Sequence, residues 1–339
     1  MQQNQLGRKK YLAQNWNVGF LIFLSADRRT AIPWCSVGSS HSTVAPLYVR
    51  NRSYTMMIFP QVSAHVNLRS DVDKQMGTDH DSQKVELMAL TVKPVQLNPK
   101  TLEAFDAYIH IGETEMEQSS HRSGSFLWSQ QAPQRAQLID QGQVVAQFWS
   151  GDGPVNMPNG LIHDWIAAAF IPDSHIQELL AVMQDYDNHK NTYKPEVIDS
   201  KLISRDGNDF QVYLRLLKKK VITVVLDTDH EVHYCPVDQT RWVCRSYTTR
   251  IAEVENAGKP EERVFEPDTG YGFLWRLYSY WRFEERNAGV VVECRAISLT
   301  RDVPFGLGWA IEPIIEKLPK ESLINTLEAT RQAVHTKAG

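Results

Sequence analysis

Three groups of ionisable residues in the C-terminal half of the chain could carry chemistry. His163 and Asp164 are adjacent, but neighbouring side chains of a strand point to opposite faces, so these two cannot act as one acid–base pair. Asp185, Asp187 and His189 have the side-chain types of metal ligands, and two of them stand one helical turn apart. A third ligand in that arrangement is missing. We therefore expect no metal site and no resident cofactor.

His230 interrupts the apolar face of an expected strand, between Leu226 and Val232. A buried polar side chain needs a hydrogen-bond partner, which could be a ligand or another side chain. His230 and Asp164 are therefore the two candidates for catalysis. No P-loop, Gly-x-Ser-x-Gly elbow or His-Glu-x-x-His motif accompanies them, so binding is favoured over catalysis.

Glu293 and Arg295 lie two residues apart and share one face of an expected strand. Opposite charges so placed predict a structural ion pair. Asp227, Asp229, Glu231 and His233 alternate in the same way along another strand, a spacing typical of a solvated outer face.

The elements that position these residues form the strongest pattern in the sequence. A strand is expected at 161–171, then an amphipathic helix that begins at Ser174, and a C-terminal helix at 305–335. Pro313 and Pro319 are expected to break or kink that last helix. Six further antiparallel strands are expected between the helices, at 196–204, 210–217, 221–234, 241–254, 271–286 and 290–301.

The strand at 271–286 shows the clearest alternation. One face carries Tyr271, Phe273, Trp275, Leu277, Trp281 and Phe283. The other carries Arg276, Arg282, Glu284 and Arg286. The pattern predicts a sheet with one buried face and one wet face.

This order of elements resembles the START-like, helix-grip (SRPBCC) superfamily, which includes lipid-transfer START domains and polyketide cyclases. The matching segments are FIPD (170–173), DYDNHKNTYKPEV (185–197), YWRFEE (280–285), ISLTRDVP (297–304) and GLGW (306–309). The resemblance covers about 160–334 and implies an α+β fold. A seven-stranded antiparallel sheet would wrap the C-terminal helix, and the two would enclose a cavity for a lipid, sterol, polyketide or similar molecule.

The apolar side chains of the sheet and the helix should line that cavity. The expected ligand contacts are Trp165, Leu214, Val224, Leu226, His230, Phe273, Trp275, Leu277, Trp281, Ile311 and Ile315. Three functions remain open: binding or carriage of an apolar small molecule, a cyclase, hydratase or hydrolase reaction with pocket His or carboxylate groups, and an interaction or structural role with a filled core. Cavity volume and clustered ionisable groups would discriminate among them.

Residues upstream of this domain fall into two parts. Residues 98–159 predict a helix at 99–118 and a hairpin of strands at 134–139 and 143–149, packed on the main domain 160–336. Residues 1–95 have no sustained periodicity, which predicts a disordered N-terminal extension or an over-long reading frame that truly starts at Met76 or Met88.

Composition limits the partners. The chain has 339 residues and a formal net charge of −4, with Lys and Arg in excess before residue 95 and Asp and Glu in excess after it. A folded part that is acidic does not favour nucleic-acid binding. No segment approaches the length of a membrane span, so we expect a soluble protein, with a cytoplasmic location favoured. Export is the alternative, because 18–26 resembles a short signal sequence.

The four cysteines have no Cys-x-x-Cys spacing, which disfavours a zinc or redox site. Cys244 and Cys294 fall within strands and are expected to be buried thiols. Pairing of Cys235 with Cys244 across a hairpin is the alternative for an exported protein.

Overall fold

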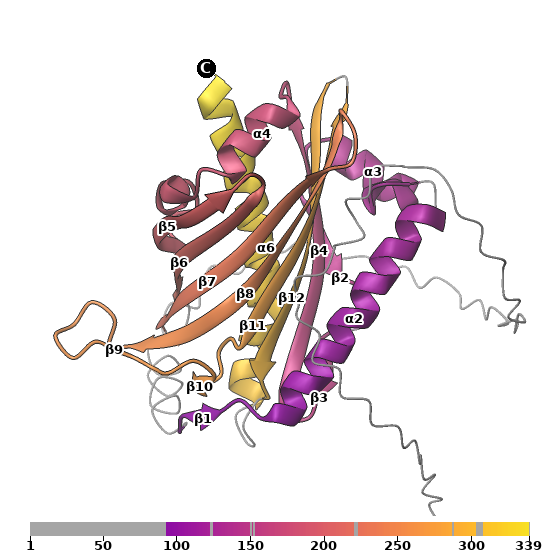
Figure 1. The fold of residues 1–339 in the computed structure, drawn as a ribbon. Coiled ribbons are helices and arrows are strands. Elements are labelled where there is room, and N and C mark those ends of the chain that lie inside the picture. Colours follow the sequence, from indigo (N-terminus) through magenta and orange to yellow (C-terminus); the bar gives the residue numbers. More distant parts are fainter. Residues whose placement is uncertain are drawn as a thin grey trace, which may run out of the picture.

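The computed structural model describes residues 93–122, 125–149, 151, 153–219, 223–286, 288–302 and 308–338 (Figure 1). The side chains of 119–122, 308–316 and 338 are outside this description. The expectations for the first 92 residues therefore lie outside the described residues, as do the ligand contacts expected of Ile311 and Ile315.

A ten-stranded antiparallel sheet dominates the described part of the chain (Figure 1). Its main path runs in the order β2 (Val145–Phe148), β4 (Gly160–Pro172), β12 (Gly289–Arg301), β11 (Arg276–Arg286), β8 (Arg241–Glu255), β7 (Thr223–Pro236), β6 (Asp209–Lys219) and β5 (Val197–Asp206). The short strands β3 (Val155–Met157) and β9 (Arg263–Val264) pair with β4 and β8. A separate two-stranded ladder joins β1 (Val95–Gln96) to β10 (Thr269–Gly270).

Helices lie on both faces of the sheet. They are α2 (Pro99–Arg122), α3 (Pro133–Asp140), α4 (Ile176–Met183), α5 (His189–Thr192) and α6 (Gly308–Ala338), with 3-10 turns η2 (Ser129–Gln131) and η3 (Tyr186–Asn188). Helix α6 crosses one face, which we call the inner face, and α2 crosses the other, the outer face (Figure 1).

Alternation along β4 explains why the sheet is covered on both sides. Its odd-numbered residues from 165 to 171 join a core cluster with Leu323, Leu327 and Val334 of α6. Its even-numbered Ile162 joins a second cluster with Phe105 of α2. The architecture is thus an α+β helix-grip fold, as predicted, although the sheet has ten strands rather than seven.

Two local predictions differ from the structure. Residues 134–139 form helix α3 and not a strand, because Pro133 stands at the start of the helix, where its fixed φ favours a helical turn. Helix α6 continues from 308 to 338, so neither Pro313 nor Pro319 breaks it, and the kink expected as the alternative stays a prediction. A proline removes one backbone hydrogen bond, whereas the packing of the buried Leu323 and Leu327 holds the segment in place.

The thiols of Cys244 and Cys294 are free and buried, so the pairing of Cys235 with Cys244 does not form. Among the described residues, no helix is both long enough and apolar enough to cross a membrane.

Candidate functional site: the inner face of the sheet

Several predicted contacts meet on the inner face. Trp165 of β4 and Trp281 of β11 are buried in the core cluster that includes α6 and α4, and Leu214 of β6 packs against it. Leu277 belongs to the same face, because it lies four residues before Trp281 on β11. Leu226 is buried on β7, four residues before His230.

Trp275 and Phe273 do not lie on the inner face with these residues. Trp275 precedes the regular part of β11 and packs in the outer cluster under α2. Phe273 is 39% exposed, and its backbone amide is held by the Glu253 carboxylate. The expected alternation fails here because the chain is irregular before Arg276. Val224, near the start of β7, is half-buried.

A row of polar side chains crosses the inner face, and sequence reasoning missed it as a group. The register places Ser298 of β12 opposite both His163 of β4 and Leu277 of β11. Directly opposed residues point to the same face. The same rule adds Ser279, Ser246, Thr248 and His230. We call the set His163, Thr228, His230, Ser246, Thr248, Ser279, Ser298 and Thr300 the polar belt. The sequence signal that could have predicted the polar belt is the presence of Ser and Thr at inward-facing positions of the strands.

His230 has its partners within the belt. One ring nitrogen, Nε2, lies 2.9 Å from Thr228 Oγ1, and Nδ1 lies 3.3 Å from Ser246 Oγ. Burial lowers the pKa of His230 to about 4, with a further contribution from His189. The imidazole is therefore neutral near pH 7 and is bound by side chains of the protein itself.

His163 and Trp165 differ from the rest of the belt and its neighbours. His163 Nε2 lies 3.1 Å from Thr300 Oγ1, and burial lowers the pKa of His163 to about 4. Its Nδ1, and the Nε1–H of Trp165, are buried without a hydrogen-bond partner among the described residues. The Nε1–H of Trp281, by contrast, donates to Ser279 Oγ at 3.1 Å.

Asp164 lies on the outer face, away from the belt. Arg295 donates to it twice, from Nε to Oδ1 at 2.9 Å and from Nη2 to Oδ2 at 2.6 Å. The hydroxyl of Tyr108 in α2 donates to Oδ2 at 2.8 Å. The guanidinium also lies 4.1 Å from the centre of the Trp149 ring. Burial, reinforced by the negative charge of Asp164, raises the pKa of Tyr108.

The ion pair predicted between Glu293 and Arg295 does not form, since Arg295 binds Asp164. Glu293 instead accepts hydrogen bonds from the backbone N–H groups of Trp128 and Ser129, at 2.8 and 2.6 Å. Burial nevertheless raises the pKa of Glu293. These contacts attach the segment after α2 to β12.

The prediction of a wet outer face is wrong for β11. Arg282 donates to the backbone carbonyls of Phe126 and Met116, and burial lowers the pKa of its guanidinium. The chain that follows α2 covers this side chain, which the alternating pattern of β11 alone could not show.

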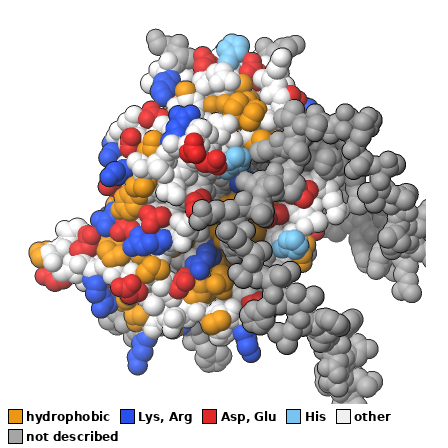
Figure 2. Space-filling model, viewed as in Figure 1, with side chains coloured by type: hydrophobic (Ala, Val, Ile, Leu, Met, Phe, Trp, Pro, Cys, Tyr) orange, Lys and Arg blue, Asp and Glu red, His pale blue; other side chains and the backbone are white. Residues whose placement is uncertain are grey.

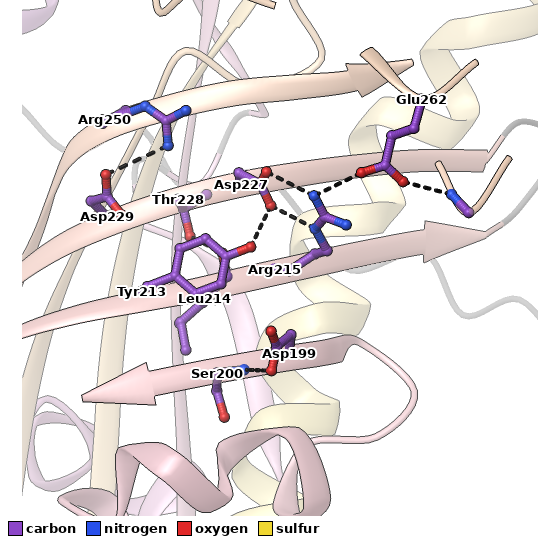
Figure 3. Close-up of polar contacts among 11 residues, drawn as sticks. Asp199, Ser200, Tyr213, Leu214, Arg215, Asp227, Thr228, Asp229, Arg250 and Glu262 are labelled. Carbon is purple, nitrogen blue, oxygen red and sulfur yellow. Dashed lines mark hydrogen bonds and ion pairs between the residues drawn. The ribbon is translucent and has the colours of Figure 1, made fainter. Parts of the chain in front are cut away.

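Farther across the outer face, on β6 to β8, charges pair with one another (Figure 3). Arg215 and the hydroxyl of Tyr213 both contact Asp227 Oδ1 at 2.7 Å, and Arg215 also reaches Glu262 at 3.1 Å. Asp227 is consequently buried rather than solvated. Figure 2 shows basic and acidic side chains intermixed in this region. No group of His, Cys, Asp and Glu within the described ranges could hold a metal ion.

Comparison with known proteins gives matches in structure alone. No family model matches the sequence, and no curated protein matches it.

Three solved structures illustrate the likeness. A protein from Thermus thermophilus is 16% identical, with a TM-score of 0.37, and the match covers 51% of this chain and 98% of the other. The STAR-related lipid transfer protein from Xanthomonas axonopodis is 14% identical, with a TM-score of 0.38 and coverage of 54% and 99%. The Streptomyces aromatase/cyclase Zhui is 8% identical, with a TM-score of 0.38 and coverage of 52% and 96%. Such values assign neither a ligand nor an activity to this chain.

Proposed function

From the START-like helix-grip fold of this chain, we propose that the protein binds an apolar small molecule between the inner face of the sheet and helix α6. The observation that carries the proposal is the unequal cover of this face. Helix α6 packs chiefly on β2, β4 and β12 and against α4 and α5. The cluster of α6 and α4 includes Phe210 of β6 and Tyr234 of β7. Leu226 of β7 and Leu277 of β11, nearer the other end of these strands, lie outside that cluster.

Dimensions support a space beside the helix. The main path of the sheet contains eight strands, which at about 4.8 Å per neighbour span roughly 34 Å. A helix with its side chains is only about 10–12 Å across. The sheet is therefore wider than helix α6, and helix α4 covers a further part of its inner face.

The side chains at and beyond the edge of that cluster suit an apolar ligand. Leu214, Leu226 and Leu277 stand on β6, β7 and β11, and Leu214 packs against the cluster that contains Trp281. Ligand sites of this type are mostly apolar, with a few polar groups that fix orientation. The polar belt supplies such groups.

The positions of the two candidate catalytic residues, His230 and Asp164, do not support catalysis. His230 lies on the inner face, where Thr228 and Ser246 bind it. Asp164 lies on the outer face in a buried ion pair. A general acid and a general base must both reach the reacting group, and the sheet separates these two.

Native mass spectrometry after gentle purification tests the proposal directly, because a co-purified apolar molecule would appear as an added mass. A thermal-shift screen with fatty acids, sterols and aromatic polyketides is the complement. A ligand that binds only the folded state stabilises it by about 2.7 kcal/mol at 100 times its Kd. Absence of both an added mass and any stabilisation would support the filled-core alternative.

A filling variant locates the site. Leu277→Trp adds bulk to the inner face and should weaken ligand binding by about 10-fold or more, which corresponds to about 1.4 kcal/mol. Ile111→Trp is the matched control, since Ile111 on α2 is 58% exposed. Unchanged binding by a folded Leu277→Trp protein would place the ligand elsewhere.

A further inference from the structure

Two buried hydrogen-bonding groups on the inner face lack a partner in the described part of the protein. They are His163 Nδ1 and Trp165 Nε1. His163 is fully buried and Trp165 is 5% exposed. An unpaired polar group in such a place costs about 1–3 kcal/mol, so each position favours a molecule that supplies the missing partner.

The hydrogen bonds around His163 favour one tautomer of its neutral ring. The hydroxyl of Thr300 lies 3.2 Å from the backbone carbonyl of Arg301 and donates to it. With its single proton so used, the hydroxyl accepts from His163 Nε2, which then carries the ring proton. Nδ1 is left as a bare acceptor. Trp165 Nε1–H is a donor, so the two unpaired groups are of opposite kinds.

Their spacing suits a single small group. His163 and Trp165 are two residues apart on β4, whose register with β12 is unbroken, so both rise from the inner face. The Cα atoms of residues so placed are about 7 Å apart along a strand, and both side chains are long enough for their ring nitrogens to reach one shared group. One oxygen atom with two hydrogen bonds of about 2.9 Å bridges nitrogens up to about 6 Å apart.

We propose that the apolar ligand carries a hydroxyl group, which accepts a hydrogen bond from Trp165 Nε1–H and donates one to His163 Nδ1. This inference rests on the proposed function and adds the chemistry of the ligand's polar end. An ionised carboxylate is a poor occupant, because it can accept from Trp165 but cannot donate to His163.

One nearby cation suggests a different ligand group, a carboxylate, and the test must distinguish it from a hydroxyl. Lys320 Nζ of α6 lies 5.7 Å from the centre of the Trp165 ring. It could attract a carboxylate ligand through charge. Asp164 and Arg295, the neighbouring charged pair, lie on the opposite face and are bound to each other.

The test compares four probes of similar length on the full chain: decanol, decyl methyl ether, undecane and decanoate, each measured by displacement of anilinonaphthalenesulfonate fluorescence. The ether keeps the acceptor oxygen but lacks the donor. We expect decanol to bind about 3- to 10-fold more tightly than the ether, and the ether more tightly than undecane, since a hydrogen bond contributes about 0.5–1.5 kcal/mol.

Variants assign each hydrogen bond. Trp165→Phe should weaken decanol and the ether by the same factor, whereas Trp281→Phe, whose indole N–H already has a partner in Ser279, should remove no ligand hydrogen bond. His163→Gln keeps a group near the Nε2 position but loses the Nδ1 acceptor. It should lower decanol affinity to that of the ether and leave the ether unchanged.

The outcomes separate the two proposals. If decanol, the ether and undecane bind wild-type protein equally, the hydroxyl inference fails and the apolar site stands. Tightest binding by decanoate would also overturn the hydroxyl inference, in favour of an anion near Lys320. If none of the probes binds and no ligand co-purifies, the proposed function itself fails. The probe series needs only wild-type protein, so a variant that does not fold leaves it decisive.

Discussion

At the scale of single residues, the most consequential feature is the buried pair of Asp164 and Arg295. Their side chains are only 1% and 4% exposed. An ion pair so placed gains little net stability as a unit, but loss of one member leaves an unpaired buried charge. The tyrosine hydroxyl from α2 that contacts Asp164 links this pair to the cover of the outer face.

Asp164→Ala should therefore destabilise the protein by about 3–5 kcal/mol in urea unfolding, because Arg295 remains buried without its partner. Asp199→Ala is the control. Asp199 pairs with Lys190 at the surface and is 52% exposed, so its loss should cost about 1 kcal/mol or less. The double change Asp164→Leu with Arg295→Met should recover much of the loss. Equal effects of the two single changes would contradict the assignment.

Buried histidines predict a dependence of stability on pH. Burial lowers the pKa values of His163, His189 and His230 from 6.5 to about 4. Between these values the unfolded chain binds protons that the folded protein excludes. The free energy of unfolding therefore falls as pH falls through this window.

His230→Gln should remove about 1.4 kcal/mol per pH unit from that slope. Burial raises the pKa values of Glu253 and Glu293, which makes the free energy of unfolding change with pH in the opposite direction. This contribution is the same in wild type and variant, so it cancels in the comparison. The exposed His335→Gln serves as control. Urea unfolding at several pH values measures the slope, and an identical slope in wild type and His230→Gln would refute the prediction.

At the scale of elements, α6 shows how packing overrides local preference. Pro319 stands within a continuous helix, although proline costs about 3 kcal/mol in a helix interior relative to alanine. The same helix buries Leu323, Leu327 and Val334 in a core cluster with residues of the sheet and of α4. This burial offsets the free energy lost with the hydrogen bond.

Pro319→Ala should consequently raise the free energy of unfolding, by up to about 3 kcal/mol. Pro133→Ala is the matched control, because Pro133 begins α3, where a proline costs no hydrogen bond. Thermal unfolding measures both. A lower melting temperature for Pro319→Ala would show that the proline ring makes a contact that α6 requires.

At the scale of the whole molecule, helix α2 and the segment at 127–131 cover the outer face of the sheet over β4, β11 and β12. Phe105, Ile109 and Met116 of α2 are buried against it, and Glu293 binds the backbone at Trp128 and Ser129. A protein cut back to residue 160 would expose this apolar surface and the Asp164–Arg295 pair.

A chain that starts at Met88 should melt within a few degrees of the full chain, because it retains β1, α2 and the sheet. A chain that starts at Gly160 should lose cooperative unfolding, since the outer face is then uncovered. Circular dichroism melts compare the two. Loss of cooperativity in the Met88 chain would show that the first 87 residues belong to the folded unit.

The sequence by itself determined the order and type of most elements. Apolar runs and alternation predicted β4 to β8 and β12 within about two residues, because side chains of a strand alternate with a period of two. The predicted start of β11 was five residues too early, since the chain is irregular before Arg276. The same alternation placed His163 and Asp164 on opposite faces. It could not say what covers each face, so Arg282 was expected in solvent, whereas the chain after α2 partly covers it.

Only the tertiary structure decided the partners. Arg295 binds Asp164, which is 131 residues away in sequence, rather than Glu293 two residues away. His230 finds Ser246 from the next strand, while His163 and Trp165 each keep a group with no partner in the part of the chain that the structure describes. Such pairings depend on which strands become neighbours and on their register. Both are set by long-range contacts, which leave no trace in the local pattern of a single chain.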